Sequence, residues 1–307
     1  MERQSPRPAL GRAPGKLIVV GEHAVVYGRP AVAVPFPFVE VVAEAIPVPG
    51  AVRVTSDRTV PDLKGLTRTA EAALVAVGEA PANLSVHLRS TIPVGAGLGS
   101  SAASAVAVAR AAAAVFGGTL PVTLLRGVAS IAEREAHGRP SGLDVEAVLA
   151  EGPIRFVSGE EATPVVTSFR PRWLVADSGR ARDTRGAVAA VAAWLASEGA
   201  AGRLALDGLA READVAARAL AEGDAQGLGA SLNRAHEALQ ALGVSDGGLD
   251  ELVGTARDVG ALGAKLTGAG RGGCVVALAP DARTAGAITT AWRRVGVAGV
   301  YGEGARA

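Results

Sequence analysis

A glycine-rich stretch that ends in two serines, Pro93 to Ser104, has the residue types needed to hold a phosphate. Glycines at positions 95, 97 and 99 let the backbone bend tightly and approach a ligand closely. The alanine-rich run that follows, to about Phe116, predicts a helix, and the N–H groups at its start favour an anion. Ser100 or Ser101 is expected to cap this helix, while the other hydroxyl could reach a phosphate-bound Mg²⁺. The alternative is a tight turn before a capped core helix.

Two carboxylates further along the chain could serve the same chemistry. Glu133 falls in a predicted helix over 122–135 and could complete an oxygen ligand set for Mg²⁺. Asp144 follows a Pro-Ser-Gly turn at the opening of a helix, where it could accept a proton from an attacking hydroxyl. Lys16 could pair with Asp144 and keep it ionised. An Asp at such a position can also be only a helix cap.

A second glycine loop, Gly268 to Gly273, fits the pattern G-x-G-x-x-G. The dinucleotide-binding fingerprint requires a helix after the glycines, whereas a strand-like run, Cys274–Leu278, follows here. We therefore reject a nicotinamide site. The backbone N–H groups of the loop could line a phosphate or substrate pocket, or the loop could be a tight connection between strands.

Other polar residues remain open to two interpretations. Glu22 and His23 form a polar pair after a strand, where a histidine is commonly a hydrogen-bonded structural residue. Arg180, Arg182 and Arg185 could hold an anionic substrate group or form a solvated loop. No His/Cys cluster has the spacing of a zinc site.

The composition indicates a globular protein of the cytoplasm. Of 307 residues, 49% are apolar and 20% charged, which allows an ample core, and the formal net charge of +1 gives no reason to expect nucleic acid or a membrane surface as partner. The single cysteine, Cys274, excludes an internal disulfide. The polar, Pro-containing start of the sequence is unlike a signal peptide.

Strands and helices interleave without strict βαβ units, so we expect an α+β fold. The expected strands cover 17–20, 31–34, 39–45, 52–55, 84–88, 154–157, 173–176, 274–278 and 298–301. The expected helices cover 66–77, 100–116, 122–135, 145–149, 186–196, 204–222, 225–242, 248–259 and 284–295. Residues 1–12 are expected to be a loose arm, and a domain boundary is expected near 163–171.

Three motifs, taken together, resemble the GHMP kinase family. They are Ala13-Pro-Gly-Lys-Leu with Gly21-Glu-His-Ala-Val-Val-Tyr-Gly28, Pro93 to Ala103, and Lys265 to Cys274. His137-Gly-Arg-Pro-Ser-Gly-Leu-Asp144 and the segment from Asn233 through His236 to Val244 resemble the branch whose members phosphorylate mevalonate. The likeness spans roughly residues 13 to 280.

The resemblance implies a two-domain fold with the active site in the cleft between the domains. Residues 1–168 would be the N-terminal nucleotide-binding domain and residues 169–307 the C-terminal domain. The implied reaction is ATP-dependent phosphorylation of the 5-hydroxyl of (R)-mevalonate in isoprenoid biosynthesis, with Asp144 as catalytic base and Lys16 as its charged partner. Ser101 and Glu133 would be Mg²⁺ ligands. The resemblance leaves a homodimer open.

The resemblance also assigns binding residues. The ATP phosphates would lie against Pro93, Gly95, Ala96, Gly97, Leu98, Gly99, Ser100 and Ser101. Mevalonate would be bound by Lys16, Glu22, His23, Asp144, Thr184, Gly268 and Ala269.

Two departures keep alternatives open. Val145 follows Asp144 where many mevalonate-phosphorylating relatives have asparagine, and Asp-Val resembles the branch that acts on 5-phosphomevalonate. Arg271 replaces a glycine of the third motif. A non-catalytic, metabolite-sensing relative is a further alternative, although Lys16, Ser101, Glu133 and Asp144 are all present.

Overall fold

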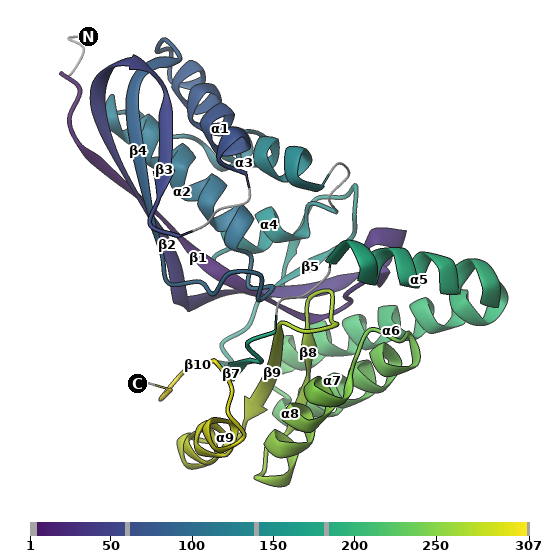
Figure 1. The fold of residues 1–307 in the computed structure, drawn as a ribbon. Coiled ribbons are helices and arrows are strands. Elements are labelled where there is room, and N and C mark those ends of the chain that lie inside the picture. Colours follow the sequence, from purple (N-terminus) through teal and green to yellow (C-terminus); the bar gives the residue numbers. More distant parts are fainter. Residues whose placement is uncertain (1–4, 59–61, 138–140, 181–183, 306–307) are drawn as a thin grey trace. The chain divides into compact units, whose positions relative to one another are not determined.

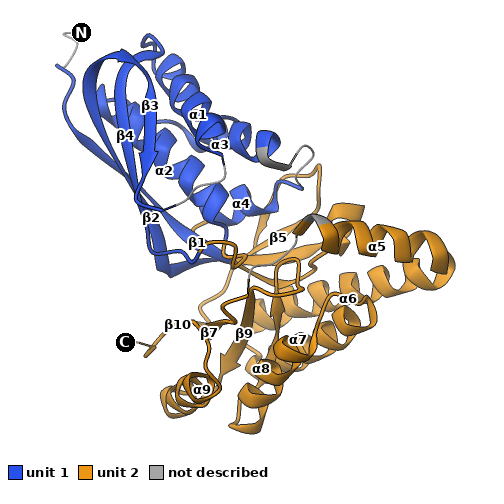
Figure 2. Cartoon of the chain, in the orientation of Figure 1, with its two compact units in different colours: residues 1–16, 35–93, 99–149 blue, residues 17–34, 94–98, 150–307 orange. Residues whose placement is uncertain are grey.

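The structure, a computed structural model, describes residues 5–58, 62–137, 141–180 and 184–305. It divides the chain into two compact units (Figure 2). Unit 1 comprises residues 1–16, 35–93 and 99–149, and unit 2 comprises residues 17–34, 94–98 and 150–307. The expected division at residue 168 stays a prediction.

Strands and helices follow one another in mixed order along the chain, in places as runs of several helices or several strands (Figure 1). The strands are β1 (Ala9–Val20), β2 (Ala31–Ala51), β3 (Arg53–Ser56), β4 (Ala82–Ser90), β5 (Ile154–Phe156), β6 (Thr163–Pro164), β7 (Arg172–Asp177), β8 (Gly263–Thr267), β9 (Cys274–Ala279) and β10 (Gly299–Gly302). The helices are α1 (Leu63–Ala76), α2 (Ser100–Val115), α3 (Val122–His137), α4 (Leu143–Leu149), α5 (Thr184–Glu198), α6 (Ala200–Glu222), α7 (Ala225–Ala241), α8 (Gly247–Asp258) and α9 (Ala282–Arg294), with a short 3-10 helix η1 (Ala24–Tyr27).

In unit 1, helices α1, α2 and α3 pack on one another, and α1 and α2 pack against a sheet in which β4 pairs with β2 and β3 (Figure 1). Helix α2 is buried around most of its circumference because its alanines and valines leave little side chain to keep it apart from neighbours. Strand β1 approaches it closely: a Cβ at Gly11 would lie 2.1 Å from the Ala107 carbonyl oxygen. Small residues therefore set the spacing in this unit.

In unit 2, an antiparallel sheet of order β10-β7-β9-β8 carries helices α7, α8 and α9. Every residue of β8 and β9 is buried. Each of the three helices begins at an aspartate whose carboxylate accepts a backbone N–H of the first turn. These caps are Asp224, Asp246 and Asp281, at 2.9, 3.0 and 2.7 Å from Gly227, Gly248 and Thr284. Such caps fix where each helix starts.

The structure confirms the α+β prediction, and each predicted helix is present. It corrects the prediction of a loose arm over residues 1–12, because β1 already begins at Ala9. The two strands expected at 31–34 and 39–45 form the single long strand β2. Strand β8 was not predicted, and it leads directly into the second glycine loop. Within the described parts of the chain, no helix is both long enough and apolar enough to cross a bilayer.

Candidate active site

The expected pairing of Lys16 with Asp144 is present in unit 1. Lys16 Nζ lies 2.8 Å from Asp144 Oδ1. The lysine side chain is buried, whereas the Asp144 side chain is 35% exposed. A carboxylate that is fixed by a buried cation and still open on one side can accept a proton from a bound hydroxyl group.

Short-range contacts place Asp144 at this point. Asp144 is the second residue of α4, whose first turn is closed by the Glu146 N–H donating to the Gly142 carbonyl at 3.2 Å. Arg126 of α3 forms an ion pair with Glu146 and ties the two helices together. Residues 138–140 of the predicted His-Gly-Arg-Pro segment lie outside the described residues.

Lys16 also contacts the glycine-rich turn. Gly95, Gly97 and Gly99 all have positive φ, at 73, 88 and 79°. A Cβ at Gly99 would lie 2.7 Å from Lys16 Cγ, so the lysine stem occupies the space where a side chain would be. The lysine therefore links the turn to Asp144, and the turn requires glycine there for both conformation and space.

The predicted serine cap of α2 is wrong. Gly99, in the left-handed conformation, is the residue before the helix, and no side chain caps it. Ser100 and Ser101 are the first two helical residues, and both are half-buried. The backbone N–H groups of this first turn therefore have no side-chain acceptor from the cap position, and a bound anion could accept from them.

Glu133 lies near the end of α3, which packs against α2. The residue is buried. Within the described residues, no three His, Cys, Asp or Glu side chains gather as a ligand set for a metal ion.

In unit 2, Glu22 and Lys265 form a fully buried ion pair, in which Lys265 Nζ also donates to the Leu266 carbonyl at 2.6 Å. Burial raises the pKa of the Glu22 carboxyl, and the charge and hydrogen bond of Lys265 oppose this shift, as does the backbone N–H of Gly268. Thr267 Oγ1 donates to the Ile18 carbonyl at 3.1 Å. These contacts tie β1 to the start of the second glycine loop.

His23 holds the next residue of the same loop. Its Nε2 lies 3.0 Å from the Ala269 carbonyl oxygen, so the proton is on Nε2. Burial lowers the pKa of His23. The backbone at His23 has φ of 60°, which is uncommon for a residue other than glycine. Glu22 and His23 were expected to contact substrate, and the structure places their side chains where they position Gly268 and Ala269.

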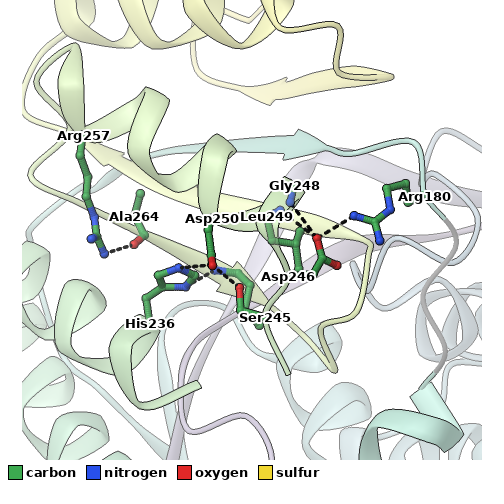
Figure 3. A network of polar contacts seen from close by, with 10 residues as sticks. Arg180, His236, Ser245, Asp246, Gly248, Leu249, Asp250, Arg257 and Ala264 are labelled. Carbon is green, nitrogen blue, oxygen red and sulfur yellow. Dashed lines mark hydrogen bonds and ion pairs between the residues drawn. The ribbon is translucent and has the colours of Figure 1, made fainter. Parts of the chain in front are cut away.

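Of the three arginines expected to bind an anion, the structure describes the side chain of Arg180. Arg180 Nη1 donates to Asp246 Oδ1 at 2.6 Å (Figure 3). The Arg180 carbonyl accepts the Gly273 N–H. Arg182 and the side chain of Arg185 lie outside the described residues. Thr184 is half-buried at the first position of α5. Arg180 therefore organises the loop before α8.

Sequence reasoning missed the role of Lys265 as the partner of Glu22. These residues are 243 positions apart, and the available signal was only that Lys265 is one of three lysines in an arginine-rich chain. It also missed Asn233 and His236 as hydrogen-bond partners of β8.

Two sequence profiles match the chain, one in each half of it. The profile described as GHMP kinases N terminal domain matches residues 63–152, and that described as GHMP kinases C terminal matches residues 216–298. The chain belongs to the GHMP kinase family.

Individual proteins with sequences or structures similar to this chain include kinases that act on mevalonate and on phosphomevalonate. The mevalonate kinase of Aeropyrum pernix is 36% identical over 297 residues, which cover 89% of each chain. The crystal structure of L. major mevalonate kinase in complex with R-mevalonate matches with a TM-score of 0.83 and 27% identity, covering 95% of this chain and 93% of that one. The Streptococcus pneumoniae phosphomevalonate kinase, in complex with phosphomevalonate and AMPPNP, shares the fold at a TM-score of 0.80 and 20% identity, covering 95% and 99%.

Proposed function

We propose that this chain transfers the γ-phosphoryl group of ATP to the 5-hydroxyl of (R)-mevalonate, giving 5-phosphomevalonate and ADP. The observation that carries the proposal is the contact chain from Gly99 of the glycine-rich turn through Lys16 to Asp144. It joins a phosphate-binding type of turn to a partly exposed carboxylate. GHMP kinases use ATP, and the relative from Aeropyrum pernix, which is similar over most of the chain, is a mevalonate kinase.

Asp144 is the proposed base. The 5-hydroxyl oxygen forms a bond to the γ-phosphorus of ATP, and the hydroxyl proton passes to an Asp144 carboxylate oxygen. The bond between the γ-phosphorus and the oxygen that bridges it to the β-phosphate breaks as ADP leaves. Lys16 orients the Asp144 carboxylate through the ion pair, at 2.8 Å. In such reactions positioning and neutralisation of charge supply most of the acceleration.

The turn and the first residues of α2 are proposed to bind ATP. The ATP phosphates would accept hydrogen bonds from the backbone N–H groups of Gly95 through Ser101, and Pro93 would lie at the start of the turn. Ser101 and the buried Glu133 are oxygen donors, as Mg²⁺ prefers, and two protein ligands suffice because Mg²⁺ keeps waters and phosphate oxygens as further ligands. When bound, Mg²⁺ would neutralise charge on the phosphates.

The loop at Gly268 and Ala269 is proposed to bind mevalonate, together with Thr184. Glu22 and His23 bond directly to this loop, so they fix its backbone and present it to the substrate. Lys16 and Asp144 would contact the reacting hydroxyl.

5-Phosphomevalonate is the second candidate substrate, because Val145 follows Asp144 and an arginine cluster stands at 180–185. The Arg180 ion pair with Asp246 weakens this candidate, since it neutralises one of those arginines. The shared fold of both relatives does not discriminate between the substrates.

Side-by-side assays of ADP release would decide between them. We expect release with (R)-mevalonate and little with 5-phosphomevalonate, and the opposite ratio would assign the second substrate. Absence of release with either would overturn the proposal and leave a non-catalytic relative.

We further propose that the protein acts in the cytoplasm on small molecules, without nucleic acid or a membrane as partner, and that a homodimer is compatible with this activity.

A further inference from the structure

Strand β8 is the edge of its sheet, and side chains rather than another strand cover its outer side. One side pairs with β9. On the other side, Asn233 of α7 accepts the Ala264 N–H at 3.1 Å and donates to the Leu262 carbonyl at 3.3 Å. Arg257 of α8 donates to the Ala264 carbonyl at 2.9 Å. Exposed strand edges are commonly covered in this way.

His236 completes this cover at the end of β8 that leads to the glycine loop. Its Nδ1 accepts the Leu266 N–H at 3.4 Å, so the ring proton is on Nε2, which donates to Asp250 Oδ1 at 3.1 Å. Ser245 donates to the same oxygen at 2.5 Å. Figure 3 shows His236 from α7 and Asp250 from α8 pointing toward each other beside the strand. His236 is 2% exposed, and its pKa, lowered by burial to about 4, keeps it neutral and able to accept.

The Leu266 amide lies inside the segment that sets the loop. Lys265, one residue before, is paired with Glu22 and donates to the Leu266 carbonyl. Thr267, one residue after, bonds to the Ile18 carbonyl. A shift of the Leu266 backbone therefore moves Lys265 and, with it, the Glu22 carboxylate. The Gly268 amide is hydrogen-bonded to Glu22, so it moves as well.

We propose that His236 is a positioning residue for the reaction: by holding the Leu266 amide it places Lys265, Glu22 and the 268–269 loop for mevalonate. His236 touches no reacting group in this proposal and acts through the strand. The inference rests on the proposed function, because its readout is mevalonate binding.

A set of three variants separates this role from a merely structural one. His236→Leu fills the space but has no acceptor. His236→Asn offers an amide oxygen near the place of Nδ1. His236→Gln reaches toward the place of Nε2 and leaves the Leu266 amide unpaired, and it also serves if the leucine variant does not fold.

The KM for mevalonate is the quantity to measure, alongside the KM for ATP. Because the Leu266 amide is left as an unpaired buried donor, we expect the mevalonate KM of His236→Leu and His236→Gln to rise ~10-fold. His236→Asn should restore it to within ~3-fold of wild type, and the ATP KM should change less than ~2-fold in all three, since the broken hydrogen bond leads to the mevalonate loop.

Trp292→Phe is the matched control. Trp292 is buried in α9, and its indole N–H donates to the Leu252 carbonyl at 2.8 Å, so the variant loses one buried hydrogen bond between α8 and α9. It should lose stability without a change in either KM. An unchanged mevalonate KM in His236→Leu and His236→Gln, or an equal rise in Trp292→Phe, would overturn the inference while leaving the proposed function standing. A wild-type protein that releases no ADP with mevalonate would overturn both the role of His236 and the proposed function.

Discussion

Lys16 occupies the space that a side chain at position 99 would need. Gly99 has φ of 79°, and a Cβ there would lie 2.7 Å from Lys16 Cγ and 3.1 Å from its Cε. We therefore expect Gly99→Ala to displace the ammonium group from Asp144 and to lower turnover by ~10²-fold, the usual effect of a misplacement of about 1 Å. Steady-state kinetics with saturating substrates measures this.

Gly78→Ala is the control for backbone strain. Gly78 is in the same unit with φ of 81°, and no atom lies within 4 Å of its added Cβ. Both variants should lose about 1–2 kcal/mol of stability from the left-handed conformation, but only Gly99→Ala should lose turnover. Equal turnover in the two proteins would show that the lysine does not depend on this space.

The low pKa of His236 makes the stability of the fold depend on pH. Burial lowers this pKa to about 4, with Arg257 and Lys265 acting in the same direction and Asp250 opposing them. As pH falls from about 6.5, the ordinary value, the unfolded chain takes up a proton that the folded chain does not. Stability is therefore full above this range and decreases as pH falls toward 4, by up to ~3 kcal/mol from this group.

Urea unfolding at pH 7 and pH 4.5 measures this effect, with His236→Asn as the control because asparagine does not titrate. The wild-type protein should lose more stability between the two pH values than the variant. An equal loss would place the responsible groups elsewhere.

Residue types, together with the resemblance of two motifs to those of GHMP kinases, predicted the pairing of Lys16 with Asp144. They did not predict that Glu22 and His23 hold Gly268 and Ala269, since those contacts join segments more than 240 residues apart. The prediction of a serine cap was wrong because Gly99, in a left-handed conformation, is the cap residue, and the helix begins at Ser100.

At the scale of elements, α7 and β8 approach so closely that glycine is needed on both. A Cβ at Gly229 would lie 2.5 Å from the Leu262 carbonyl oxygen, and a Cβ at Gly263 would lie 2.1 Å from the Gly229 carbonyl oxygen. Gly229→Ala should therefore force the helix away from the strand and destabilise the fold by about 1–3 kcal/mol, the usual cost of overpacking.

Gly254→Ala in α8 is the matched helical control. No atom lies within 4 Å of its added Cβ, so it should raise stability by up to ~1 kcal/mol through helix propensity alone. Chemical denaturation of both variants measures the two effects. A neutral Gly229→Ala would mean that the helix and strand can move apart without cost.

The helices were predicted well because their apolar periodicity is a local signal, as for α8 and α9. Strand β8 escaped prediction because Gly-Ala-Lys-Leu-Thr has little strand character and is held by α7, α8 and β9. Strand β1 was predicted too short because Gly-Arg-Ala-Pro-Gly reads as a turn, yet it pairs with β2.

At the scale of the molecule, each unit contributes a separate part of the proposed chemistry. Unit 1 carries Lys16, Asp144, Ser101 and Glu133, the groups proposed for proton transfer and for Mg²⁺. Unit 2 carries the Glu22–Lys265 pair and the 268–269 loop proposed for mevalonate. The proposed activity therefore requires the whole chain.

Turnover of (R)-mevalonate by the wild-type protein and by Asp144→Asn, measured in parallel with ATP and Mg²⁺, tests the central claim most directly. The wild-type protein should release ADP and form 5-phosphomevalonate. Asp144→Asn should fold and bind ATP as the wild type does, and its turnover should be lower by ~10²–10⁴-fold because no base remains. Near-normal turnover in a folded Asp144→Asn protein would contradict the account.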